Sequence, residues 1–239
     1  MPYSKYFKNG QKILLCPLEG EDPDRHESLT LYVHDIGAKH FDLKLPYQEK
    51  PGEEYPFTPG MKMMLSSESI GLGIKVSGVF ESRIAANLIR VRLNSDLKVF
   101  QRRLSPRTDA SIGLRYAKGR GTMRSFRSQW EKNVQLLSSG SDLSKLSRLP
   151  RYAVNLGPGG IRFKVKPPVG IADICLLLME LDDKSPPICA LAEVVWFHEQ
   201  KEEERYPTGM QFISIRKSDQ ARLEAFVQDL GMTEQSVEP

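Results

Sequence analysis

The sequence predicts an all-β protein built from two antiparallel β domains, the second of which is closed by a C-terminal α-helix. Apolar and polar residues alternate in many short runs, which is the period of half-buried strands. Turn-forming stretches such as "EGEDPD" separate these runs too regularly for a helical domain. With 239 residues, the chain is long enough for two small domains that each bury a core.

Residues 1–98 are expected to form the first domain, because the alternation recurs through this stretch. Its apolar members at every second position include Leu29, Leu31, Val33, Phe41, Leu43, Leu45, Ile89, Val91 and Leu93. Successive side chains of a strand point to opposite faces, so these residues are expected to face a core.

Residues 99–232 are expected to form the second domain, followed by a tail at 233–239. One of its strands is predicted where Ile161, Phe163 and Val165 alternate with Arg162, Lys164 and Lys166. The closing helix has apolar residues at helical spacing, namely Leu223, Phe226, Val227 and Leu230. Ser218 is its expected N-cap and Gly231 its expected C-terminal stop.

Residues from about 119 to 150 differ from their surroundings, because their apolar residues are three or four apart. These residues are Phe126, Trp130, Val134 and Leu137. We therefore predict a helical insertion within the second domain. Trp130 is expected to anchor this insertion rather than to stack on a base, and Trp196, in the strand-like "AEVVWF", is expected in the core.

The sequence contains no motif for catalysis, for a metal or for a redox cofactor. The histidines never have HExxH spacing, and there is no CxxC, P-loop or G-x-S-x-G motif. Three cysteines, an odd number beside apolar neighbours, predict reduced thiols in a reducing compartment. The first residues lack the apolar region of a signal peptide, and no apolar run could span a bilayer. We expect a cytoplasmic protein that is not an enzyme and has no metal, cofactor or membrane span.

Two segments carry groups that suit an anionic nucleotide. "QRRLSPR" places Arg103 and Arg107 four residues apart, directly after Arg102, and guanidinium groups donate in pairs to phosphate or to the guanine edge. "NLGPGGIRF" contains three glycines, which permit positive φ and let a ligand approach main-chain amides. Asn155 adds an amide that can meet a base edge. Each segment by itself also fits a solvated turn.

Together with "AEVVW" and "TGMQFISI", these two segments resemble the PilZ domain, a bacterial receptor for the second messenger cyclic di-GMP. The family has an R-x-x-x-R motif and a D/N-x-S-x-x-G motif before a barrel strand. Arg103 and Arg107 match the two arginines, and Asn155 and Gly160 match the ends of the second motif. Gly157 stands where the family has serine.

The resemblance implies a six-stranded antiparallel barrel with a C-terminal helix, and cyclic di-GMP as the ligand, without a cofactor. It implies that Arg103 and Arg107 bind guanine and phosphate, that Asn155 binds a guanine edge and that Gly160 shapes the turn. Residues 1–98 resemble the N-terminal domain of flagellar brake proteins. The partner implied is a flagellar motor or other output machinery for motility, biofilm formation or secretion. No DNA partner is expected, and a homodimer stays open.

Two features modify this expectation. Without the serine hydroxyl at Gly157, one hydrogen bond is lost, at a cost of about 0.5–1.5 kcal/mol, or about 1.5–3 kcal/mol with a charged partner. We therefore expect roughly tenfold weaker binding. Arg102 could stack on the guanine of a second ligand and favour an intercalated ligand dimer, or it could be solvated.

Two other functions remain open at this stage. A degenerate PilZ protein would have given up the nucleotide and would act as a constitutive interaction module, which Gly157 favours and the intact Arg103, Arg107, Asn155 and Gly160 oppose. A single-stranded nucleic-acid binder would need aromatic platforms on a basic face, and few aromatic residues fall there.

Overall fold

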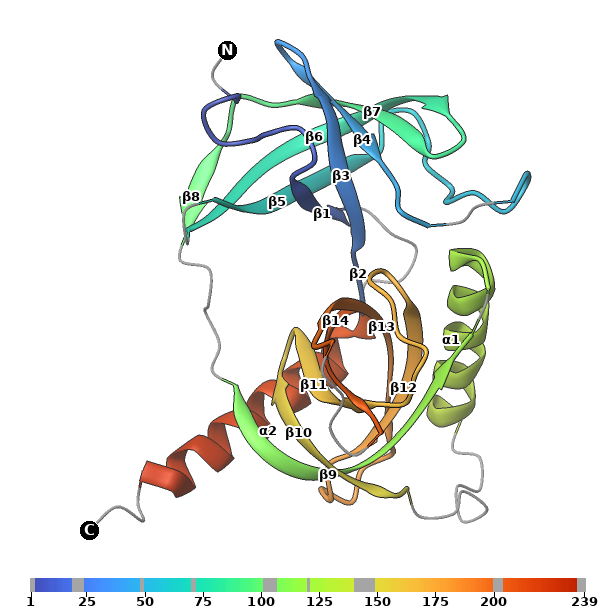
Figure 1. The fold of residues 1–239 in the computed structure, drawn as a ribbon, viewed down its shortest axis with the longest axis vertical. Helices are drawn as coiled ribbons and strands as arrows, with labels where there is room; N and C mark the ends of the chain where they lie inside the picture. The colour runs from blue at the N-terminus through green and yellow to red at the C-terminus, as the bar shows by residue number, and fades with distance from the viewer. Residues whose placement is uncertain are drawn as a thin grey trace. The chain divides into compact units, whose positions relative to one another are not determined.

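A computed structural model of the chain describes most of its residues, in eight segments (Figure 1). These are residues 3–18, 24–47, 50–69, 72–100, 107–119, 121–139, 149–199 and 204–235. The chain divides into two compact units. The first contains residues 1–23, 27–104 and 122–124, and the second contains residues 24–26, 105–121 and 125–239.

The first unit is a closed antiparallel barrel of six strands in the order β5-β1-β3-β4-β7-β6, which the β5–β6 pairing closes. An additional strand, β8, pairs with β6 outside the ring. The strands are β1 (Lys12–Pro17), β3 (Leu29–Ile36), β4 (His40–Lys44), β5 (Lys62–Ser69), β6 (Leu72–Ala85), β7 (Leu88–Leu93) and β8 (Lys98–Phe100).

The alternation predicted for this unit is confirmed, since the apolar residues that it assigned to the core are buried. Two polar residues that alternate with them are buried as well. The main-chain N–H of Thr30 donates to the Tyr47 hydroxyl at 2.8 Å. Asp42 is 7% exposed and accepts two hydrogen bonds from Arg90. The buried Asp42 carboxylate needs such a partner, because an unpaired group loses its hydration without compensation. The buried Thr30 hydroxyl has no hydrogen-bond partner among the described residues.

The second unit is also a closed six-stranded antiparallel barrel, in the order β11-β10-β9-β12-β13-β14 with a closing β11–β14 pairing. Its strands are β9 (Thr108–Lys118), β10 (Arg151–Gly157), β11 (Gly160–Val165), β12 (Ile174–Glu180), β13 (Ile188–Phe197) and β14 (Tyr206–Arg216). The short strand β2 (Arg25–Glu27) pairs with β14 outside the ring. A strand from the N-terminal part of the sequence thus extends the second sheet, which alternation alone does not reveal.

Helix α2 (Lys217–Gln235) seals this barrel, as predicted. It packs against β9, β10 and β14 (Figure 1). Leu223 and Val227 are fully buried in the barrel core, and Phe226 packs against it. Each fully buried aliphatic side chain contributes about 1.5–3 kcal/mol relative to an exposed one.

The ends of α2 differ from the prediction. The helix starts at Lys217, so Ser218 lies inside the first turn and is not the N-cap. Asp24 accepts the helix-start hydrogen bonds instead, from the Ser218 N–H at 2.9 Å and the Ser218 hydroxyl at 2.7 Å. Gly231 does not stop the helix, which continues to Gln235. The carboxylate of Asp24, which is distant in the sequence, therefore accepts hydrogen bonds at the helix start, where the sequence had predicted Ser218 as the N-cap.

The predicted insertion contains helix α1 (Met123–Ser138), and residues 140–148 lie outside the described part of the chain. Trp130 is 2% exposed and its indole N–H donates to the Cys189 carbonyl at 3.0 Å. The guanidinium of Arg25 lies 4.8 Å from the Trp130 ring centroid and pairs with Glu131 at 2.8 Å. Trp130 therefore anchors α1 to the second unit, as predicted.

The cysteines of the second unit, Cys175 and Cys189, are free and buried, and Cys16 is free and half-buried. Burial raises the pKa of Cys175 and of Cys189 to about 12, and that of Cys16 to about 11. Within the described residues, neither helix is long and apolar enough to cross a membrane.

Candidate functional site

The glycine-rich segment forms the tight hairpin between β10 and β11. Gly157 pairs with Gly160 across the turn. The Phe212 N–H donates to the Gly159 carbonyl at 3.0 Å, and the Gln220 amide of α2 donates to the Pro158 carbonyl at 3.1 Å. The turn is therefore fixed by both β14 and α2.

Gly160 is required by close packing rather than by positive φ, which the sequence had suggested for this segment. A Cβ atom there would lie 2.4 Å from the Met210 carbonyl oxygen, where β11 and β14 close the barrel. Neither Gly159 nor Gly160 has a φ in the positive range, and a Cβ at Gly159 would meet nothing within 4 Å. These two glycines therefore do not use the positive φ that glycine permits.

The strand register brings the two predicted motifs to the same end of the barrel. Thr108 of β9 pairs with Leu156, and Asp109 pairs with Asn155. Arg107 is exposed and immediately precedes β9. It lies one residue beyond the Thr108–Leu156 pair, at the end of β10 that carries Gly157. Arg102 and Arg103 lie outside the described residues.

A polar cluster occupies the outer face of β9, β10 and β11. The Asn155 amide donates to Asp109 Oδ1 at 2.9 Å. The Arg162 guanidinium reaches the same oxygen at 3.5 Å. These side chains face outward because their neighbours in sequence, including Val154 and Phe163, fill the barrel core.

This cluster forms one side of a shallow surface pocket with a volume of about 420 Å³. The polar and exposed aromatic residues that line it are Asp109, Asn155, Arg162, Lys164, Trp196 and His198. The pocket spans the outer face from β9 to the end of β13. Among the predicted ligand residues that the structure describes, Asn155 is the one that lines it.

Trp196 lies in this pocket, and the prediction that it belongs to the core is wrong. Its side chain is 37% exposed. The β13–β14 register shifts between Val194 and Trp196, so the bulge reverses the parity that would have turned the indole inward. A Cβ at the paired Gly209 would lie 2.2 Å from the indole nitrogen. The bulge and the glycine together place the ring on the outer surface.

The pocket offers several kinds of interaction to a ligand. Arg162 and Lys164 supply positive charge for phosphate groups, and Arg107 precedes the same face. Trp196 and His198, whose ring centroids are 5.5 Å apart, present aromatic surface for a base. Asp109 opposes an anion and holds the Asn155 amide, so a bound anionic ligand would compete with these contacts.

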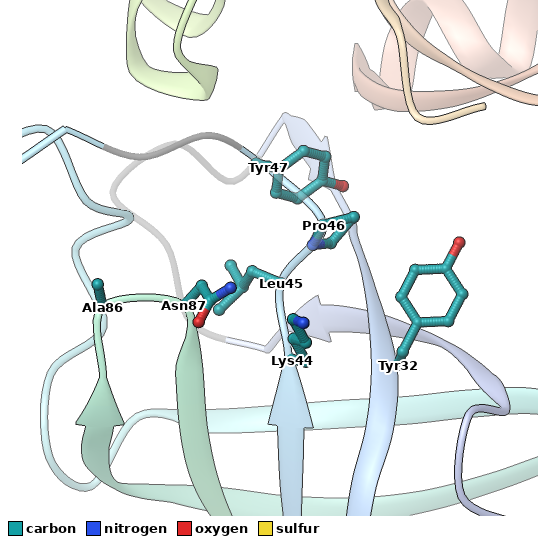
Figure 2. A pocket seen from close by; sticks show the side chains of 7 residues that line it. All are labelled: Tyr32, Lys44, Leu45, Pro46, Tyr47, Ala86 and Asn87. Carbon is teal, nitrogen blue, oxygen red and sulfur yellow. The ribbon is translucent and has the colours of Figure 1, made fainter. Parts of the chain in front are cut away.

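A larger pocket, with a volume of about 830 Å³, lies in the first unit (Figure 2). Its lining residues are Tyr32, Lys44, Leu45, Pro46, Tyr47, Ala86 and Asn87. Tyr32 and Lys44 come from paired positions of β3 and β4, and Lys44 is the one charged residue among the described lining residues (Figure 2). The residues predicted to bind a nucleotide belong to the second unit, so volume alone does not identify the candidate site.

The family model described as "PilZ domain" matches residues 101–229. This match spans more than half of the chain. The chain belongs to the PilZ domain family. This is a family of cyclic di-GMP receptors, and its proteins are ligand-binding effectors. A search of curated proteins found no match for this PilZ protein.

Solved structures of other proteins align along both units of this PilZ protein. The Bacillus subtilis inhibitor of motility MotI/DgrA is 13% identical with a TM-score of 0.39, and the alignment covers 95% of this chain and 99% of that one. Escherichia coli YcgR in complex with c-di-GMP is 10% identical with a TM-score of 0.36, covering 95% and 86%. The K. pneumonia MrkH–c-di-GMP complex is 15% identical with a TM-score of 0.34, covering 96% and 90%.

Sequence reasoning missed Asp109, Arg162, Lys164, Trp196 and His198 as pocket residues of this PilZ protein. The sequence could have identified Arg162 and Lys164, because they alternate with core residues on the strand that follows the glycine turn. No comparable signal existed for Trp196, whose direction depends on a bulge.

Proposed function

We propose that this protein is a cyclic di-GMP receptor that binds its ligand on the outer face of the second barrel. The observation that carries the proposal is the pocket at Asn155, Arg162 and Trp196, directly beside the start of β9. The R-x-x-x-R segment ends at Arg107, which directly precedes β9, so in this proposal the segment brings its arginines to this face.

The chemistry of the pocket supports a guanine dinucleotide. Arg162 and Lys164 match its phosphates, and the Trp196 indole can stack on a base. The side chain of Asn155 has both a donor and an acceptor for a guanine edge. Asp109 accepts a hydrogen bond from Asn155. When the ligand binds, the Asp109 carboxylate would have to release the Asn155 amide or turn toward guanine N–H groups.

The mechanism proposed for signalling is closure of the arginine segment over the ligand, which reorients the two domains toward an output partner. The N-terminal domain, residues 1–98, would play the part of the flagellar-brake-like domain that it resembles. Motility, biofilm formation and secretion are the outputs considered, in a cytoplasmic protein.

The decisive experiment is isothermal titration of cyclic di-GMP into the full-length protein. We expect saturable binding that weakens about 10- to 150-fold in Arg103→Ala and in Asn155→Ala, because a hydrogen bond to a charged group contributes about 1.5–3 kcal/mol. Lys132→Ala, which removes an exposed cation of α1, is the matched control and should bind as the wild type does. The stoichiometry tests Arg102, since an intercalated ligand dimer requires two ligands per chain.

The competing function is a degenerate PilZ protein that acts as a constitutive interaction module. Gly157 in place of serine and the Asp109 carboxylate in the pocket favour it. Absence of binding heat in the wild type, with correct folding by circular dichroism, would support this alternative and overturn the receptor.

A further inference from the structure

The β3–β4 hairpin of the first unit carries two histidines and two aspartates within nine residues, His34, Asp35, His40 and Asp42. Ligand atoms of Asp35, His40 and Asp42 all lie within 4.8 Å of one another. We propose that this cluster binds a divalent transition metal, with zinc as the best match. The site lies outside the PilZ barrel and is independent of cyclic di-GMP binding.

A β-bulge in β3 places the Asp35 side chain on the same face of the hairpin as Asp42. The register passes from Val33↔Leu43 directly to Asp35↔Asp42, so one extra residue lies in β3. Val33 and Leu43 are buried, whereas His34 and Asp35 are both exposed. Strict alternation would have turned one of these two residues inward. Bulges commonly re-aim side chains at functional sites.

His40 is held in place by the hairpin itself. It lies two residues before Asp42 on β4 and therefore shares its face. A Cβ atom at Gly37 would lie 2.3 Å from the His40 imidazole, so the ring rests on the bare backbone of this glycine. The Gly37 N–H also donates to the His40 carbonyl at 2.9 Å. A ligand that is ordered before binding loses less entropy when it binds.

Asp42 is oriented by Arg90, as metal-binding carboxylates commonly are by neighbouring groups. Arg90 Nε donates to Oδ1 at 2.7 Å and Nη2 donates to Oδ2 at 2.8 Å. Each carboxylate oxygen has a second lone pair that remains available.

The net charge of the cluster favours a cation. Two carboxylates outweigh the single Arg90 guanidinium. Arg92, which pairs in register with His40, has its own partner in Glu81 at 3.1 Å. A dication would therefore meet a local excess of negative charge.

The donor set favours zinc over the alkaline-earth ions. Zinc accepts imidazole nitrogen together with carboxylate oxygen, whereas calcium and magnesium prefer oxygen alone. Donors of a tetrahedral zinc site are about 3.4 Å apart, so ligand atoms that lie up to 4.8 Å apart must approach one another by up to about 1.4 Å. Rotation of the exposed Asp35 side chain can supply this shift, and His34 or a water molecule can occupy the fourth position.

The test uses full-length protein that has been stripped with a chelator and then titrated with zinc chloride. We expect one zinc ion per chain by calorimetry and by elemental mass spectrometry after dialysis. His40→Ala and Asp35→Asn should each lower the zinc affinity at least tenfold. His198→Ala, which removes an exposed histidine of the second unit, is the matched control and should leave this zinc affinity unchanged.

Zinc affinity that is equal in the wild type and in both site variants would overturn the proposal, as would loss of zinc on dialysis. Binding of calcium in preference to zinc would overturn the choice of metal. Thermal unfolding of the stripped variants shows whether they are folded, and Asp35→Asn, at an exposed position, keeps the test valid if His40→Ala is unstable. Cyclic di-GMP titration should be unaffected by either variant, which separates this site from the proposed receptor function.

Discussion

Gly160 shows, at the scale of the residue, how a single missing side chain lets the second barrel close. Gly160→Ala places a Cβ atom 2.4 Å from the Met210 carbonyl oxygen, and backbone cannot move aside as a flexible side chain can. We expect the free energy of unfolding to fall by about 1–3 kcal/mol. Gly159→Ala is the control, since a Cβ there meets nothing within 4 Å. Thermal unfolding that is equal in both variants would contradict the steric argument.

Trp196 is a built-in reporter of the proposed ligand site. The protein has two tryptophans, and Trp130 is buried beneath Arg25. Stacking of a base on Trp196 should quench its fluorescence, and Trp196→Ala should weaken cyclic di-GMP binding about 5- to 150-fold, because each stacked base contributes about 1–3 kcal/mol. A fluorescence change that persists in Trp196→Ala would place the ligand elsewhere.

Gly157 tests the meaning of the missing serine. The residue is buried at the end of β10, on the face that carries Asn155. We expect Gly157→Ser to bind cyclic di-GMP roughly tenfold more tightly in calorimetry, because the hydroxyl restores one hydrogen bond. If affinity falls while the protein stays folded, the hydroxyl does not reach the ligand from this buried position.

Asp24 shows, at the scale of the element, how a distant residue can determine where a helix begins. It accepts the first hydrogen bonds of α2 through Ser218, and the Lys217 N–H donates to its carbonyl at 2.5 Å. Asp24→Ala should lower the stability by about 0.5–2 kcal/mol, the usual cost of losing an N-cap. The double variant with Ser218→Ala should lose less stability than the sum of the losses in the two single variants. Gln228→Ala, at an exposed position of the same helix, is the control and should leave the stability nearly unchanged.

The contribution of Asp24 should depend on pH. Burial would raise the pKa of Asp24, but hydrogen bonds from Ser218 and the charges of Arg216 and Lys217 together lower it below its usual value. A carboxyl with a depressed pKa stabilises the fold above its unfolded pKa of about 3.9. The stability difference between wild type and Asp24→Ala should therefore be complete at pH 7 and should shrink as the pH falls below about 4. A difference that is constant down to pH 2 would contradict this.

The chain passes between the two units of the whole molecule more than once. Residues 24–26 belong to the second unit, whereas residues on both sides of them in sequence belong to the first. The sequence predicted a single boundary between the domains, at residues 98 and 99. The chain also passes between the units at residues 122–124, so a reorientation of the units would involve more connections than the one near residue 104.

Small-angle X-ray scattering of the full-length protein tests the proposed reorientation. We expect the scattering profile to change when cyclic di-GMP saturates the wild type and to stay unchanged with Arg103→Ala at the same ligand concentration. Superimposable profiles at full occupancy, established by calorimetry, would contradict the reorientation and leave the binding function standing.

The sequence by itself determined the strand pattern, the C-terminal helix and the family. Alternation identified β3, β4, β7 and β11 because the core of a barrel receives every second residue, and helical spacing identified α1 and α2 for the corresponding reason. The matches of Arg107 and Asn155 to the family motifs also followed from the sequence, because both lie at the spacings of the family pattern. The domain boundaries and the ligand-binding roles of Arg102, Arg103, Arg107, Asn155, Gly157 and Gly160 stay predictions.

Only the tertiary structure decided which distant groups meet. The bulge at Trp196 moved an expected core residue into the pocket, and the bulge beside Asp35 assembled a cluster that histidine spacing had not indicated. Asp24 reached α2 from nearly two hundred residues away in the sequence. Bulges and long-range contacts depend on how strands pair across the barrel, and strand pairing joins residues whose separation in sequence carries no local signal.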